Sequence, residues 1–172
     1  MFPNIKTVKK CVPVSKECWA EKVYTLNGVE TTDARFMFVA THNGFVTASG
    51  YSVYYWLHAP GTGGWFIVDV NGPNKAPNTL GKDIFPFLMH WGVAGNVMSA
   101  EKEGTHKLGL LPVGLSSNVF IPTRENLMDG TFGDSAYPGF KCSRGNGGSA
   151  AGAFCAALLM MDGWDMKDDY PW

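Results

Sequence analysis

The middle of the chain is a series of short aromatic and β-branched segments separated by turn residues. Such residues suit pleated strands, and Gly, Pro and Asn suit tight connections. Asn43-Gly44 predicts a two-residue hairpin, Gly50 separates the next two segments, and Pro86 predicts an edge position or a late start for its strand. The sequence therefore predicts an antiparallel meander within residues 35–112, with strands at Arg35–Thr41, Phe45–Ser49, Tyr51–Ala59, Trp65–Val70, Ile84–Trp91 and Lys107–Leu111.

The two ends of the chain have different patterns. Phe2, Ile5, Val8 and Val12 recur at helical spacing, which predicts the end of an amphipathic helix over residues 1–12, stopped by Pro13. Residues 13–34 read as a loop. Residues 113–172 read as a long loop region and tail, in which residues 155–161 form a strand or short helix. A length of 172 residues with 45% hydrophobic residues predicts one domain. The expected N-terminal helix beside a strand-rich middle makes its class α+β.

The charge of the chain excludes one large class of partner. The formal net charge is −1 and 17% of the residues are charged, so there is no basic field for phosphate backbones. Nucleic acid is therefore not an expected partner.

No apolar run of eighteen or more residues occurs, and Met1-Phe2-Pro3 does not resemble a signal peptide.

Four cysteines fall into two local pairs, Cys11 with Cys18 and Cys142 with Cys155. Local pairing predicts disulfides and export from the cytoplasm, although the two other connectivities and four free thiols stay open. The four histidines are scattered and no Cys-x-x-Cys occurs, so zinc is not expected. An exported chain needs a targeting signal, and we expect that an N-terminal segment carrying it has been removed.

The loop between two of the predicted strands concentrates oxygen donors. Asp69, Asn71, Asn78 and Asp83 lie within fifteen residues, and hard cations such as Ca²⁺ need several oxygen ligands. The spacing is not that of an EF-hand, because Gly72 is the fourth residue of the loop and not the sixth. The alternative is a loop whose Asx side chains cap their own backbone. The sequence thus offers calcium-site candidates and no other cofactor.

No catalytic signature is present. Ser116-Ser117 lacks a G-x-S-x-G elbow, and residues 145–152 lack the Lys-Ser/Thr of a P-loop. We therefore predict that the chain is not an enzyme; a secreted hydrolase would need converging groups such as Asp69, Asp83 and His90. The surplus of aromatic residues also fits a secreted carbohydrate- or protein-binding module. By strand alternation, Tyr54 and Tyr55 point to opposite faces of the sheet.

Three segments resemble the type IV pilin-like family, which includes pilus subunits and the pseudopilus subunits of type II secretion. The region from Phe2 to Asn27 resembles a helix end that runs into a small disulfide loop. The run FIVDVNGPNKAPNTLGKDIFPF, residues 66–87, is similar to the family segment DxNGxxxPNxxGxDxF. The ending CAALLMMDGWDMKDDYPW, residues 155–172, is similar to the Cys-to-Tyr-Pro-Trp ending of many secretion-type members. The cleavage site and long apolar helix of the family are absent from these residues.

This resemblance implies a fold and a function. The fold would be a short N-terminal helix packed on an antiparallel sheet, with a loop stapled by Cys142 and Cys155. The function would be that of a structural subunit in an extracellular or periplasmic filament for adhesion, motility or secretion, anchored in the inner membrane before assembly. Sister subunits would be the main partners, with a host surface or a secreted substrate as further partners. The membrane contact would come only through the missing helix.

Overall fold

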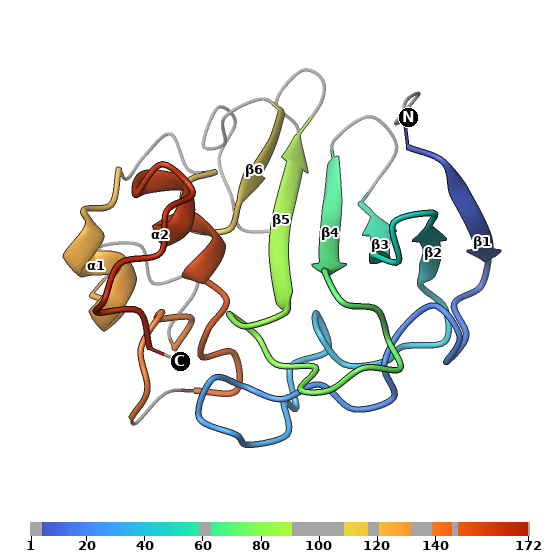
Figure 1. The fold of residues 1–172 in the computed structure, drawn as a ribbon, viewed down its shortest axis with the longest axis horizontal. Helices are drawn as coiled ribbons and strands as arrows, with labels where there is room; N and C mark the ends of the chain where they lie inside the picture. The colour runs from blue at the N-terminus through green and yellow to red at the C-terminus, as the bar shows by residue number, and fades with distance from the viewer. Residues whose placement is uncertain are drawn as a thin grey trace.

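In the computed structural model the chain forms one six-stranded antiparallel sheet and two short helices (Figure 1). The structure describes residues 5–58, 63–90, 109–116, 121–131, 139–145 and 148–171. The strands pair in chain order, so every neighbour in the sheet is also a neighbour in sequence. Their bounds are β1 Thr7–Cys11, β2 Asn43–Thr47, β3 Ser52–Leu57, β4 Gly63–Asp69, β5 Ile84–His90 and β6 Gly109–Pro112.

The predicted N-terminal helix is wrong, and with it the helix-on-sheet fold. Residues 7–11 form β1, which pairs antiparallel with β2 and places Cys11 opposite Gly44. Three or four apolar residues at helical spacing carry little weight, because so short a helix is marginal in water. Pairing with β2 instead satisfies backbone groups that an open edge would leave to solvent. Cys11 is then in place to bond to Cys18.

The predicted meander is present from Asn43 to Pro112, with two local differences. Residues 35–41 form turns and not a strand, and their Phe36 side chain is fully buried in the core. Asn43 and Gly44 belong to β2 and do not form a hairpin turn. A Cβ on Gly44 would lie 3.2 Å from Cys18 Cβ and from Val53 O, so this glycine allows the disulfide loop to approach the sheet. Tertiary packing therefore decided both positions.

Pro86 lies in an internal strand, contrary to its predicted edge position. It is opposite Ile67 of β4, and its carbonyl accepts a hydrogen bond from Val113 N at 3.2 Å on the β6 side. The nitrogen and carbonyl of one strand residue point to the same side. The missing donor of Pro86 therefore faces the β6 side, where β6 has just ended at Pro112. No ladder hydrogen bond is lost.

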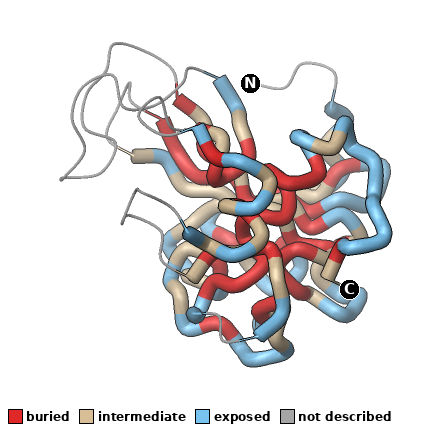
Figure 2. The backbone as a smooth tube through the Cα atoms, turned by 90° about the vertical axis from the view of Figure 1, so that its left-hand side faces the viewer, coloured by how far each residue is buried: buried red, intermediate tan, exposed pale blue. Residues whose placement is uncertain are grey.

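The hydrophobic core is built on one face of the sheet. Figure 2 shows the buried residues gathered in the interior of the molecule. Trp19, from the long loop after β1, stacks on Tyr54 with ring centroids 4.8 Å apart. Phe36 packs edge-on against both Trp65 and Phe140. The loop of residues 12–42 thus covers this face at β2–β4, and the C-terminal third covers it at β5 and β6. Two segments far apart in sequence complete one core.

The C-terminal third contains two helices within the predicted loop region. Helix α1, Arg124–Asp129, is framed by local signals, because Thr123 and Asn126 form a capping box and Gly130 takes a left-handed conformation after it. Helix α2, Cys155–Met161, has no side-chain cap and buries its first five residues. Burial against β5 and β6, and not capping, therefore holds α2 in place.

Candidate functional site

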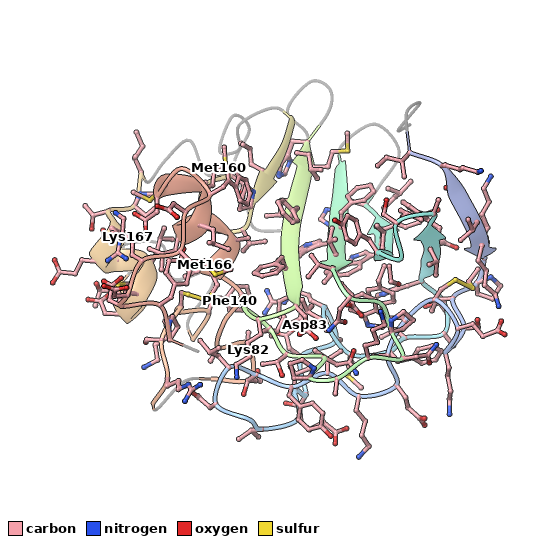
Figure 3. The ribbon with its side chains drawn as sticks, in the orientation of Figure 1. Lys82, Asp83, Phe140, Met160, Met166 and Lys167 are labelled. Carbon is pink, nitrogen blue, oxygen red and sulfur yellow. A yellow bond between two sulfur atoms is a disulfide. The ribbon has the colours of Figure 1, made fainter. Side chains whose placement is uncertain are left out.

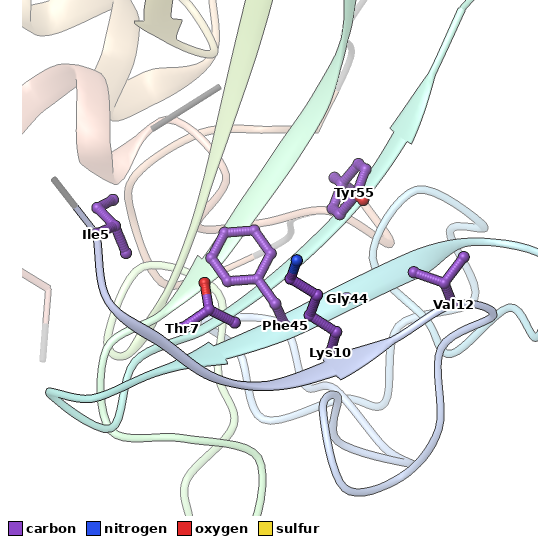
Figure 4. A pocket seen from close by; sticks show the side chains of 7 residues that line it. All are labelled: Ile5, Thr7, Lys10, Val12, Gly44, Phe45 and Tyr55. Atoms are coloured by element: carbon purple, nitrogen blue, oxygen red, sulfur yellow. The ribbon is translucent and has the colours of Figure 1, made fainter. Parts of the chain in front are cut away.

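A groove opens at the β1 end of the sheet, on the face opposite the core (Figure 4). Its volume is about 480 Å³. Tyr55 and Phe45 form its aromatic wall, with ring centroids 6.2 Å apart, and Lys10 supplies a cation. We call it the β1 groove; it is lined by Ile5, Thr7, Lys10, Val12, Gly44, Phe45 and Tyr55.

The aromatic wall of the β1 groove continues into buried side chains of β4, because Phe66 is only 1% exposed. Tyr55 stacks on Phe66 of the next strand with ring centroids 5.5 Å apart, and Phe66 is opposite Phe87 of β5. Within the part of the chain that the structure describes, neither helix contacts β1, β2, β3 or β4. The predicted opposite orientation of Tyr54 and Tyr55 is confirmed, since Tyr54 lies in the core and Tyr55 lines the groove.

A second exposed surface lies on the C-terminal tail. Trp164 is 60% exposed and takes a left-handed backbone conformation, with φ +65°. Exposed methionines precede and follow Trp164 in sequence. Figure 3 shows two of them, Met160 on α2 and Met166 on the tail that follows it. We call this surface the C-terminal patch; it consists of the exposed residues Met160, Met161, Trp164, Asp165, Met166 and Asp168.

Arg124 fixes the tail against α1. Its guanidinium donates to both carboxylate oxygens of Asp169 at 2.6 Å and to Asp162 at 3.0 Å. The hydrogen bond from Arg124 holds the pKa of Asp169 below its usual value. Burial alone would raise the pKa of Asp162, but hydrogen bonds from Lys167 and Arg124 outweigh it and lower that pKa. The C-terminal patch is therefore presented by an ordered segment.

The β1 groove and the C-terminal patch lie at opposite ends of the molecule's longest axis (Figure 1). They carry opposite charges. Lys6 and Lys10 are exposed at the first end, and Asp165 and Asp168 are exposed at the second. Among the described residues none of these four forms an ion pair. This arrangement could not be predicted from the sequence, because Lys10 and Trp164 are 154 positions apart and no local pattern relates them.

The predicted oxygen-donor residues do come together in the loop between β4 and β5. Asp83 accepts hydrogen bonds from the backbone of Asn78 and Thr79 and from the Asn71 side chain. Asp69 accepts from the backbone of Asn71 and Gly72. Burial raises the pKa of Asp69 to about 6, against these backbone hydrogen bonds, and the nearby charge of Asp83 adds to the rise. We call this segment, residues 69–83, the polar loop.

The polar loop packs on the start of the C-terminal segment, residues 155–172, and on the glycine that precedes it. A Cβ on Gly81 would lie 2.6 Å from the Sγ atom of Cys155, and a Cβ on Gly152 would lie 2.3 Å from Leu80 O. Both glycines have positive φ, so each position needs glycine for its conformation and for the close approach. Residues 66–87 and the start of residues 155–172 are therefore in direct contact.

The candidate catalytic residues are not brought together. Asp69 and Asp83 flank the beginning of β5, whereas His90 is its last residue. A strand advances by about 3.3 Å per residue, so His90 lies roughly 20 Å from the two carboxylates. Ser116 is buried, and Ser117 lies outside the described residues. Within the described residues no group of three His, Cys, Asp or Glu residues is placed to hold a metal ion.

Both predicted local disulfides are present. Cys11 bonds to Cys18 and Cys142 bonds to Cys155, which leaves no free cysteine among the described residues. These bonds are compatible with a secreted or periplasmic protein, because such compartments are oxidising. None of the helices in the described part of the chain has the length and apolar character needed to span a membrane.

Comparison of the chain with models of known protein families, with curated proteins and with solved structures gives no match. A function for this chain is therefore inferred from the chemistry of its surfaces.

Proposed function

We propose that this protein is a structural subunit of an extracellular or periplasmic filament, in which the C-terminal patch of one copy docks into the β1 groove of the next. The observation that carries the proposal is the pair of complementary surfaces at opposite ends of one molecule. A contact between two different surfaces of the same chain is heterologous, and repetition of such a contact produces an open filament. The partner is therefore another copy or a sister subunit.

Both surfaces have the composition of a protein contact. Trp164 offers a large aromatic side chain that is more than half exposed, and Met166 beside it is equally exposed. Tyr55 and Phe45 offer an apolar receiving surface in the β1 groove. Aromatic and Met side chains are enriched in protein interfaces. Lys6 and Lys10 on one side and Asp165 and Asp168 on the other add electrostatic complementarity, which favours one orientation of docking.

The sequence resemblance supports the kind of filament. Residues 66–87 and 155–172 are similar to type IV pilin-like subunits, and the two segments pack on each other in this fold. Anchoring in the inner membrane before assembly, and a role in adhesion, motility or secretion, belong to the same proposal. No catalytic step is part of it.

A charge-reversal experiment tests the head-to-tail contact. In one variant Lys6→Glu and Lys10→Glu make the groove end acidic; in the other Asp165→Lys and Asp168→Lys make the patch basic. Each variant alone faces like charges across the contact, so we expect its polymer mass in sedimentation velocity to fall by about tenfold or more. A mixture of the two restores opposite charges at every contact and should form copolymer.

The control carries the same charge change elsewhere. The variant Lys16→Glu with Lys75→Glu reverses two exposed lysines outside the groove and should polymerise like the parent chain. The variant Trp164→Ala should lose polymer without any change in charge. The proposal is overturned if the parent chain stays monomeric at every concentration, or if the mixture fails to form copolymer. A monomer that binds a glycan through Trp164 would instead favour the secreted binding module.

A further inference from the structure

Three buried oxygen atoms of the polar loop have no hydrogen-bond partner. They are Asp69 Oδ2, Asn71 Oδ1 and Asn78 Oδ1. The whole Asp69 residue is inaccessible to solvent. A buried acceptor without a partner destabilises the folded protein, and more so when it belongs to a charged group. Three such atoms in one fifteen-residue loop need a ligand that donates hydrogen bonds or carries positive charge.

The rest of the loop is arranged so that these oxygens stay available. The Asn71 amide donates through Nδ2 to Asp83 Oδ2 at 3.1 Å and to Ala76 O at 3.3 Å, which leaves its Oδ1 free to accept. Asp83 is occupied by donors on both oxygens. The backbone of Asn71 and Gly72 occupies Asp69 Oδ1 and leaves Oδ2. Backbone and amide donors thus hold the carboxylates of Asp69 and Asp83 close together. They leave Asp69 Oδ2 without a hydrogen-bond donor.

No side-chain cation of the described residues fills this place. Lys75 is exposed and Lys82 is half-buried, and neither donates to the three oxygens. An amide oxygen accepts and cannot donate, so the two Asn oxygens cannot satisfy Asp69. A proton on Asp69, a buried water molecule or a bound cation can do so.

We propose that the polar loop binds one calcium ion through Asp69 Oδ2, Asn71 Oδ1 and Asn78 Oδ1, with carbonyl oxygens or water completing the shell. All three atoms are hard oxygen donors, and two of them are neutral amides, a ligand type that Ca²⁺ accepts and Zn²⁺ does not favour. Mg²⁺ would require a stricter octahedral shell. One ligating carboxylate gives a low charge count, so the affinity should fall in the range of extracellular calcium modules, about 10⁻⁴ to 10⁻³ M.

Calcium titration of the whole chain at pH 7.5 tests the site. We expect a saturable heat signal in calorimetry and a thermal midpoint about 3–5 °C higher in 10 mM CaCl₂ than in EDTA, with a smaller response to MgCl₂. Asp69→Asn keeps the shape of the side chain and its backbone contacts but removes the charge, and it should abolish both responses.

A matched pair of variants locates the ion. Asn78→Asp places a new carboxylate at a proposed ligand, in a residue type that tolerates its φ of +49°, and should lower the Kd about tenfold. Asn74→Asp adds the same charge to an exposed residue of the same loop and should change the Kd by less than about twofold. A heat signal and thermal midpoint unmoved by 10 mM CaCl₂ would overturn the site, as would equal effects of the two substitutions. If Asp69→Asn does not fold, the Asn78 and Asn74 pair alone decides.

Discussion

At the scale of single residues, the hydroxyl of Tyr54 joins the loop of residues 36–42 to the sheet. It donates to Met37 O at 2.9 Å and accepts from Val39 N at 3.1 Å. It also lies 2.6 Å from His42 Nδ1. The ring stacks on Trp19, so one side chain serves both the apolar core and the polar groups above it. Residues 36–42 contain no strand ladder of their own and depend on such contacts.

We predict that Tyr54→Phe destabilises the protein by about 1–3 kcal/mol, because the aromatic packing stays while buried backbone groups lose their partner. Urea denaturation measures the change. Tyr51→Phe is the control, since Tyr51 is 47% exposed and its change should stay within about 0.5 kcal/mol. Equal losses in the two variants would contradict the role given to the Tyr54 hydroxyl.

At the scale of elements, the tail is attached to α1 by charge. Arg124 binds Asp162 and Asp169, whose pKa values are both lowered in the folded protein. A lowered carboxyl pKa contributes stability that is present above the ordinary value near 4 and is lost as the pH falls through the lowered folded value. The attachment of the tail should therefore weaken only in acid.

We predict that hydrogen exchange of residues 162–171 accelerates as the pH falls below about 4, once intrinsic exchange rates are allowed for. The variant Arg124→Gln removes the guanidinium charge and should show the faster exchange already at neutral pH, without a further acid step. Lys22→Gln, which breaks an exposed ion pair with Glu30 far along the chain, should leave the tail unchanged. If hydrogen exchange of residues 162–171 changes neither with pH nor in Arg124→Gln, the tail is not attached in this way.

At the scale of the whole molecule, the two disulfides join different parts of the fold. Cys11–Cys18 holds the edge strand β1 to the loop that follows it and spans seven residues. Cys142–Cys155 spans thirteen residues and joins the loop after α1 to the first residue of α2. Both cysteines are fully buried, and Cys155 lies against Gly81. The second bond therefore closes a loop within the C-terminal third, inside the core.

We predict that replacing Cys142 and Cys155 by Ala lowers the free energy of unfolding by roughly 3 kcal/mol, from loop entropy alone. Loss of packing at α2 adds to this figure. Replacing Cys11 and Cys18 by Ala should cost less, because the closed loop is shorter and lies at the sheet edge. Chemical denaturation of both double variants gives the comparison, and the reverse order of stability would count against the central position of Cys142–Cys155.

Local sequence patterns were enough to predict the core of the meander and the oxygen-rich composition of the polar loop. The strands β3, β4 and β5 are visible in the sequence because alternating apolar residues and turn residues act over a few positions. It also favoured two local cysteine pairs and left the other connectivities open. It predicted candidates such as Asp69 and Asn78, whose partners lie within the same short loop.

The remaining features follow from contacts between segments that are distant in sequence. Residues 7–11 form a strand because β2 offers a partner for their backbone, although the spacing of Ile5 and Val8 favours a helix. Phe36 lies in a buried turn because Trp65 and Phe140 surround it. The β1 groove and the C-terminal patch are far apart because β1 and α2 lie at opposite ends of the fold (Figure 1). These outcomes depend on contacts between distant segments, and such contacts gain free energy only after the chain has closed the loops between them.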